Sequence, residues 1–110
     1  MFDKPKESDW KTFRKLVPEW RERYLQEKNE QIVRLLTEEG KTPTEQFWTA
    51  KELMDDEAEG LRFCLDGHSR STMDMFLLRM LVNDMIHDDD LKAFSETLQN
   101  GFRSWRNDNG

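Results

Sequence analysis

The stretch that decides the fold is MDMFLLRMLVNDMI, residues 73–86. Wound as a helix at about 100° per residue, it places apolar side chains around nearly its whole circumference. A helix that is apolar on all sides is covered by neighbours on several sides. Its length is below the roughly 20 residues of a membrane span, and Arg79, Asn83 and Asp84 interrupt it. We therefore expect the central helix of a helical bundle, capped by Ser71 and ending near His87.

Length, charge and cysteine content narrow the class of protein. The chain has 110 residues, a net charge of −6 and one cysteine, Cys64. This length predicts a single domain with its own core. Proteins that bind nucleic acids usually carry a basic balance, so we expect no nucleic-acid partner. One cysteine excludes an intramolecular disulfide and fits a reducing compartment, and no apolar signal segment follows Met1. We expect a cytoplasmic protein without membrane attachment.

The N-terminal third shows helical spacing interrupted by a proline. Steps of three and four residues separate Trp10, Phe13, Val17, Trp20 and Tyr24. Pro18 lies inside this pattern, and a proline within a helix removes a hydrogen bond and clashes with the preceding turn, at a cost of about 3 kcal/mol. We predict a short helix from Ser8 to Leu16, a break or kink, and a second helix from Pro18 to about Glu39, with Gly40 as the stop.

The sharpest local signal is Thr-Pro-Thr-Glu at residues 42–45. Thr42 can cap a helix, Pro43 suits its first position, and Glu45 can reach back to complete a capping box. A third helix to about Leu65 follows. Its acidic residues are Glu52, Asp55, Asp56, Glu57 and Glu59. A charge run of this kind is typical of the solvated side of a helix, and the alternative is an acidic mimic of nucleic acid.

The last helix begins after Asp88 or Asp89. Helical steps join Leu91, Phe94, Leu98, Phe102 and Trp105, and they continue through Asn100-Gly101. We extend this helix to about Ser104. The whole pattern predicts an all-α, single-domain antiparallel bundle of four main helices plus a short N-terminal helix before Pro18. The bundle spans residues 8–105, between a flexible arm (1–7) and a frayed tail (106–110).

Two clusters of polar residues suggest chemistry. His68, Ser69, Arg70 and Ser71 precede a helix N-terminus, a place that attracts phosphate or carboxylate. Their simpler interpretation is a loop in which Ser71 caps the helix. Metal ligands could come from Asp84, His87, Asp88 and Asp90, but a histidine in a last helical turn and aspartates at a following cap are favourable without a metal. We expect no metal and no cofactor.

The sequence contains no Gly-rich phosphate loop and no His-Glu-x-x-His, Cys-x-x-Cys or Gly-x-Ser-x-Gly motif. We therefore expect a protein-interaction module, such as an adaptor, regulator or assembly factor, that binds another protein or itself. Trp10, Trp20 and Trp48 are the expected partner surface, because tryptophan is enriched at interfaces. The alternatives are a phosphate- or small-ligand-binding protein that uses His68, Arg70 and Ser71, conceivably an enzyme, and the acidic mimic.

Overall fold

The computed structural model describes residues 5–109, all of them in helices and their connections. Residues 1–4 of the predicted arm and Gly110 of the predicted tail lie outside this part. The elements in chain order are α1 (Glu7–Leu36), α2 (Pro43–Leu65), η1 (Arg70–Thr72), α3 (Met73–Val82), η2 (Asp88–Ala93) and α4 (Glu96–Asn109). The η elements are short 3-10 helices. The all-α prediction is confirmed.

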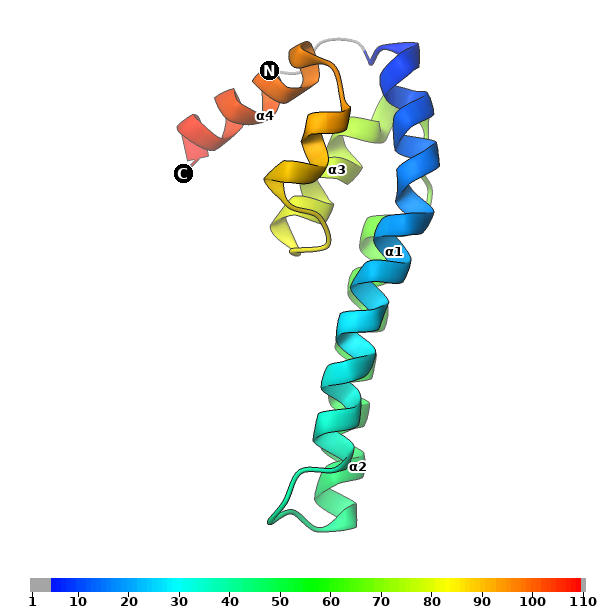
Figure 1. Ribbon diagram of the computed structural model, residues 1–110, viewed down its shortest axis with the longest axis vertical. Coiled ribbons are helices and arrows are strands. Elements are labelled where there is room, and N and C mark those ends of the chain that lie inside the picture. The colour runs from blue at the N-terminus through cyan, green and yellow to red at the C-terminus, as the bar shows by residue number, and fades with distance from the viewer. Residues whose placement is uncertain (1–4, 110) are drawn as a thin grey trace.

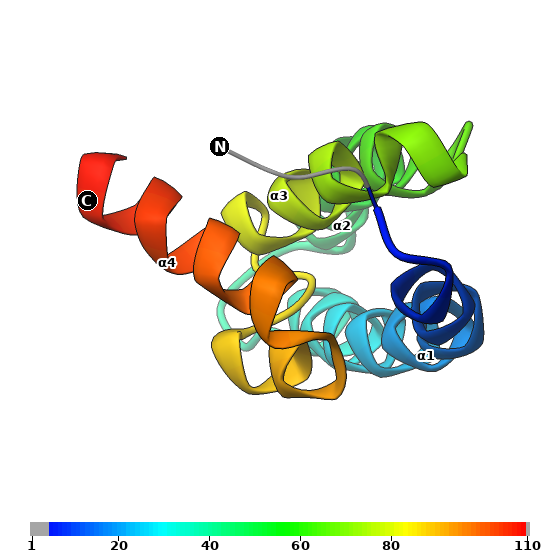
Figure 2. The same cartoon turned by 90° about the horizontal axis from the view of Figure 1, so that it is seen from above.

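Two long helices dominate the shape. α1 and α2 form an antiparallel hairpin, and the shorter elements gather beside one end of it (Figure 1). We call residues 66–109 the head. Seen from above, α4 crosses the head and leads away from the hairpin (Figure 2). The molecule measures 52 × 28 × 20 Å. The predicted bundle of four main helices is therefore not what the structure shows, because half of the hairpin extends beyond the head.

Pro18 does not divide α1, so the predicted short helix before it is wrong. The helix runs through Pro18 without interruption. The buried side chains Phe13 and Val17 before it and Trp20 after it keep one register and join the same core. Burial of these large side chains is worth about 1.5–3 kcal/mol each, which outweighs the roughly 3 kcal/mol cost of an interior proline. Pro18 itself lies on the exposed side.

The signals at both ends of α2 are confirmed. The Thr42 hydroxyl accepts the Glu45 N–H at 3.1 Å, and the Glu45 carboxylate accepts the Thr42 N–H, which completes the capping box. Gly40 and Gly67, which flank the helix, have φ of +81° and +83°. Side chains rarely adopt this left-handed region, so glycine suits both turns.

The core lies between the head and the adjacent half of the hairpin. Its buried members are Phe13, Val17, Trp20, Tyr24, Cys64, Met73, Phe76, Leu77, Met80, Met85, Ile86, Leu91, Phe94, Leu98 and Phe102. Residues 73–86 supply more of these than any other stretch of similar length, so this stretch is the centre of the core, as predicted. The prediction that this stretch is buried on every side is wrong at two residues, because Met75 is 41% exposed and Val82 is 65% exposed.

The central helix is shorter than predicted. α3 ends at Val82, and Asp84 then adopts a left-handed φ of 57°. This turn brings the N–H groups of Met85 and Ile86 back to the Met80 carbonyl and their side chains into the core. Ser71 is not the cap, because it lies inside η1, and no side chain of residues 5–109 caps α3.

The last predicted helix is two elements. η2 begins with a capping box between His87 and Asp90. α4 follows after a break at Phe94. α4 continues through Gly101, as predicted, and extends to Asn109, into the segment predicted to fray. Within residues 5–109, no helix combines the length and the apolar character that crossing a bilayer requires.

Candidate protein-interaction surface

One half of the α1–α2 hairpin extends beyond the head (Figure 1). Large apolar side chains remain exposed on this half. They are between 44% and 59% exposed and comprise Val33, Leu36, Phe47, Trp48 and Met54. Single exposed apolar residues are common on proteins, whereas a concentration on one segment marks a surface that a partner covers.

The interior of the hairpin turns polar where the head ends. The Tyr24 hydroxyl donates to the Glu57 carboxylate, whose other oxygen lies 3.5 Å from Lys28 Nζ. Burial raises the pKa of Tyr24 above its ordinary value, and the hydrogen bond to Glu57 adds to this shift. Lys28 and the half-buried Gln31 occupy positions of α1 that face α2. Apolar residues of the same segment, such as Val33 and Leu36, are therefore on other sides of the helix.

α1 carries a second apolar stripe beside its inward face. Leu25, Asn29, Ile32 and Leu36 follow one another at steps of four, three and four residues. At about 100° per residue, Leu25, Ile32 and Leu36 lie about 60–120° to one side of the inward direction marked by Tyr24 and Leu35. A shallow, mostly polar groove lies next to this stripe on the outward side of the helix, and only Leu25 and Asn29 of its lining belong to the stripe.

α2 contributes to the same side of the hairpin. Phe47 and Met54 are turned by about 40–80° from the inward direction marked by Ala50 and Glu57, in the same rotational sense as the stripe of α1. Because the two helices are antiparallel, equal rotations lead to the same side. We call this surface the tip face, and it consists of Leu25, Asn29, Ile32, Leu36, Phe47 and Met54. Trp48 lies at its edge, with its ring 5.1 Å from that of Phe47.

Negative charge is concentrated on the same segment. Residues 25–59 contain ten acidic and four basic side chains, a net charge of −6, and the rest of the chain is balanced. Asp55 pairs with Lys51 at 2.6 Å. The side chains of Glu52, Asp56 and Glu59 are exposed and take part in no ion pair or hydrogen bond within residues 5–109, so their charges face solvent without compensation.

The three tryptophans expected at a partner surface have different positions. Trp20 is 4% exposed and belongs to the core, which removes it from that surface. Trp10 is half-buried and stacks on Phe13 at 5.7 Å between ring centroids. Trp48 is exposed, beside the tip face. The sequence prediction did not include the tip face. The signal was present, because Leu25, Asn29, Ile32 and Leu36 repeat the helical spacing of the inward-facing positions one residue later.

The His68 loop is occupied by internal contacts. His68 Nε2 lies 2.7 Å from the Cys64 carbonyl, and its ring lies between Phe13 and Phe76. Arg70 pairs with Glu7 at 2.9 Å. The hydroxyl of Ser69 bonds those of Ser71 and Thr72 at 3.3 and 2.7 Å. The four predicted residues are close together, and each of them makes at least one contact within the described chain.

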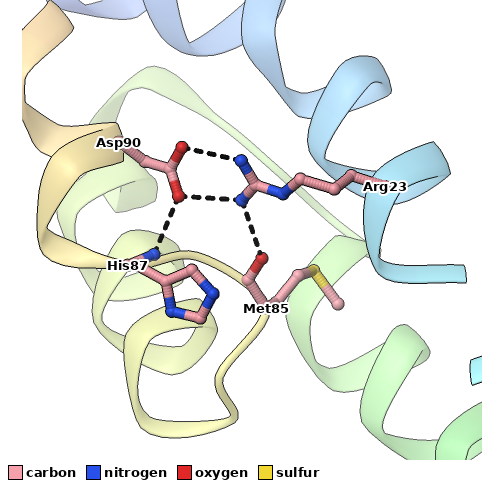
Figure 3. A network of polar contacts seen from close by, with 4 residues as sticks. All are labelled: Arg23, Met85, His87 and Asp90. Carbon is pink, nitrogen blue, oxygen red and sulfur yellow. Dashed lines mark hydrogen bonds and ion pairs between the residues drawn. The ribbon is translucent and has the colours of Figure 1, made fainter. Parts of the chain in front are cut away.

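The acidic cluster around His87 joins the head to the hairpin. Asp90 accepts two hydrogen bonds from the Arg23 guanidinium, at 2.9 and 2.8 Å, and one from the His87 N–H (Figure 3). Arg23 also donates to the Met85 carbonyl at 3.4 Å. Asp88 pairs with Arg106. Two of the carboxylates that we considered as metal ligands are therefore engaged by arginine.

Comparison with protein-family models, with curated proteins and with solved structures finds no match to this chain.

Proposed function

We propose that this chain is a protein-interaction module whose binding surface is the tip face. The observation that carries the proposal is the exposure of Leu36, Phe47 and Met54 on a hairpin segment that no other element of the described chain covers. Leu36, Phe47 and Met54 together expose on the order of 300 Å² of surface, within the range of the largest apolar patch on a typical monomer.

The architecture supports this role. The core and the Arg23–Asp90 contacts hold one half of the hairpin in the head, so the other half is presented on a rigid base. Rigid presentation of apolar side chains lowers the entropy lost on binding. An adaptor, regulator or assembly factor would use the hairpin in this way.

The test is affinity purification from the native cell with three forms of the full chain. The wild type is compared with Phe47→Ser/Met54→Ser, which alters the tip face, and with Met75→Ser/Val82→Ser, which alters exposed apolar residues of the head. We expect a protein that the wild type and the head variant retain and the tip variant loses. Equal retention by all three forms would contradict the proposal, provided that circular dichroism shows the same helix content.

The acidic mimic of nucleic acid is a second candidate, because the carboxylates of Glu52, Asp56 and Glu59 are uncompensated. It predicts binding to a basic protein through charge alone. Binding would then survive Phe47→Ser/Met54→Ser and be lost in Glu52→Gln/Asp56→Gln/Glu59→Gln.

A further inference from the structure

We propose that the groove between η2 and α4 binds a small organic acid, a monoanion whose carboxylate is attached to an apolar body. This site lies in the head, away from the tip face, and it goes beyond the proposed function. The residues that line the groove, the balance of their charges and the volume of the groove support it.

The two elements that form the last part of the chain face each other across this groove. Its lining includes Asp88, Leu91 and Lys92 of η2 and Phe102, Arg103 and Arg106 of α4, and its volume is about 320 Å³. That volume is roughly ten times the share of one water molecule in the liquid, so the groove accommodates a ligand of about ten non-hydrogen atoms.

The bottom of the groove is apolar. Leu91 and Phe102 are buried and belong to the core, whereas Lys92, Arg103 and Arg106 are exposed and form the rim. The methylene stems of these three long side chains extend the apolar lining upward, while their charged ends stay in water. An apolar ligand body is therefore removed from water at the bottom, with cations at its open side.

The rim carries one positive charge in excess. Arg106 pairs with Asp88, and Lys92 pairs with Asp89 at 2.8 Å. Three cations and two carboxylates leave a balance of +1, and the cation without a carboxylate partner within residues 5–109 is Arg103. The pair of Lys92 and Asp89 is largely exposed on both sides, so it is weak and leaves Lys92 able to turn toward a ligand.

Arg103 has the chemistry to hold a carboxylate. Its guanidinium donates to the side-chain oxygen of Asn100 at 2.5 Å, which occupies part of its five-donor fork. A planar fork of N–H groups matches the two oxygens of a carboxylate. One excess charge balances a monoanion, and the apolar bottom favours an organic acid over an inorganic ion.

The remaining carboxylates of this region leave that charge in place. Glu96 precedes Arg103 by seven residues on the same side of α4, about 10 Å along the helix, which exceeds the Debye length of about 8 Å at physiological salt. Asp90 is engaged by Arg23 on the hairpin. Asp108 is turned by about 160° from Arg106 and points away from the groove.

The experiment titrates octanoate, whose size matches the groove, into the wild-type full chain and follows amide chemical shifts. Octanol lacks the charge, octylammonium reverses it, and acetate lacks the apolar body. We expect octanoate to cause saturable shifts at residues 88–92 and 99–106 at millimolar concentration or below, with an affinity that falls with added salt. The three other compounds should bind at least about tenfold more weakly.

Variants identify the residue that holds the carboxylate. Arg103→Gln should weaken octanoate at least about tenfold, the range expected for loss of a hydrogen bond to a charged group. Arg103→Lys should bind with intermediate affinity, because it keeps the charge without the planar fork. Lys15→Gln, which removes an exposed cation of α1, and Phe47→Ser/Met54→Ser at the tip face should leave the affinity unchanged.

Four results would overturn the inference. Equal binding of octanol or octylammonium would remove the role of charge, and equal binding of acetate would remove the role of the apolar body. Unchanged affinity in Arg103→Gln, with the helix content of the wild type, would place octanoate elsewhere. Absence of saturable shifts at residues 88–92 and 99–106 would show that the groove is not a ligand site.

Discussion

The carboxylate of Asp9, in the first turn of α1, accepts hydrogen bonds from the N–H and the hydroxyl of Ser95, at 2.8 and 2.6 Å. Ser95 precedes α4, and its hydroxyl accepts the Leu98 N–H at 3.3 Å. Asp9 is 4% exposed and is the one charged residue that is buried among residues 5–109. One side chain near the start of the described chain therefore holds the first turn of the last helix.

Asp9→Ala should destabilise the protein by about 1–3 kcal/mol, because the N–H and hydroxyl of Ser95 would lose their acceptor in a site with little access to water. The free energy of unfolding in urea measures this. Lys11→Ala, on the exposed side of the same helix, should stay within about 0.5 kcal/mol of the wild type. Equal stabilities for the two variants would show that water replaces the Asp9 carboxylate.

Pro18→Ala should stabilise the protein by about 2 kcal/mol. The new N–H completes the helical ladder, worth about 3 kcal/mol, and the greater freedom of the unfolded chain offsets up to about 1 kcal/mol. The measurement is the midpoint of thermal or urea unfolding, with Glu19→Ala as the exposed neighbour. A loss of stability in Pro18→Ala would mean that the core requires a bend at this residue.

The contact between Arg23 and Asp90 should make stability depend on acid pH. Burial alone would raise the pKa of Asp90, but hydrogen bonds from Arg23 and from the His87 N–H outweigh it and place the pKa below its usual value. A lowered folded-state pKa means that the contribution is complete above about pH 4 and is lost as the pH falls through the folded-state value. Asp90→Asn should cost about 1 kcal/mol at neutral pH.

The difference in unfolding free energy between wild type and Asp90→Asn should therefore shrink below about pH 4. Asp108→Asn, at the exposed end of α4, serves as the control and should show no such difference. A difference that is constant from neutral to acid pH would assign the loss to the hydrogen bond with the His87 N–H and not to charge.

Tyr24 is the one tyrosine of the chain, so its ionisation can be followed directly by ultraviolet absorbance. Burial and the Glu57 carboxylate raise its pKa, so tyrosinate should form in the folded protein only well above the ordinary value of 10.0. A raised pKa stabilises the folded state below pH 10.0, and this contribution is lost as the pH rises through the folded-state value.

Glu57→Gln should move the Tyr24 pKa back toward its ordinary value without reaching it, because burial is the larger of the two causes. Asp55→Asn, two residues away and directed outward, should leave the titration unchanged. Full return to the ordinary value in Glu57→Gln would show that Tyr24 is accessible to water.

Local signals predicted the parts of the fold that depend on a few neighbouring residues. The capping box of Thr42 and Glu45, the end of α2 at Leu65 and the turns at Gly40 and Gly67 follow from hydrogen bonds and backbone preferences within one turn of the chain. The burial of residues 73–86 followed from their composition, because removing so many large apolar side chains from water is strongly favourable.

Pro18 and Val82 show where local reasoning failed. The cost of the proline was estimated correctly for an isolated helix, but core contacts of Phe13, Val17 and Trp20 lie outside any local window. Val82 is as apolar as its buried neighbours, and only the turn at Asp84 leaves it in solvent. The same holds for the predicted partner surface, because residue type does not show that Trp20 is buried and Trp48 is exposed.

The amino-acid sequence by itself determined that the chain is helical and which stretch forms its centre, because periodicity, caps and apolar content act over a few residues. The tertiary structure alone decided that α1 passes through its proline, that the head covers only half of the hairpin, and that the tip face is open. These outcomes depend on which apolar stripe of each helix is buried against another element of the chain, and those elements are distant in the sequence.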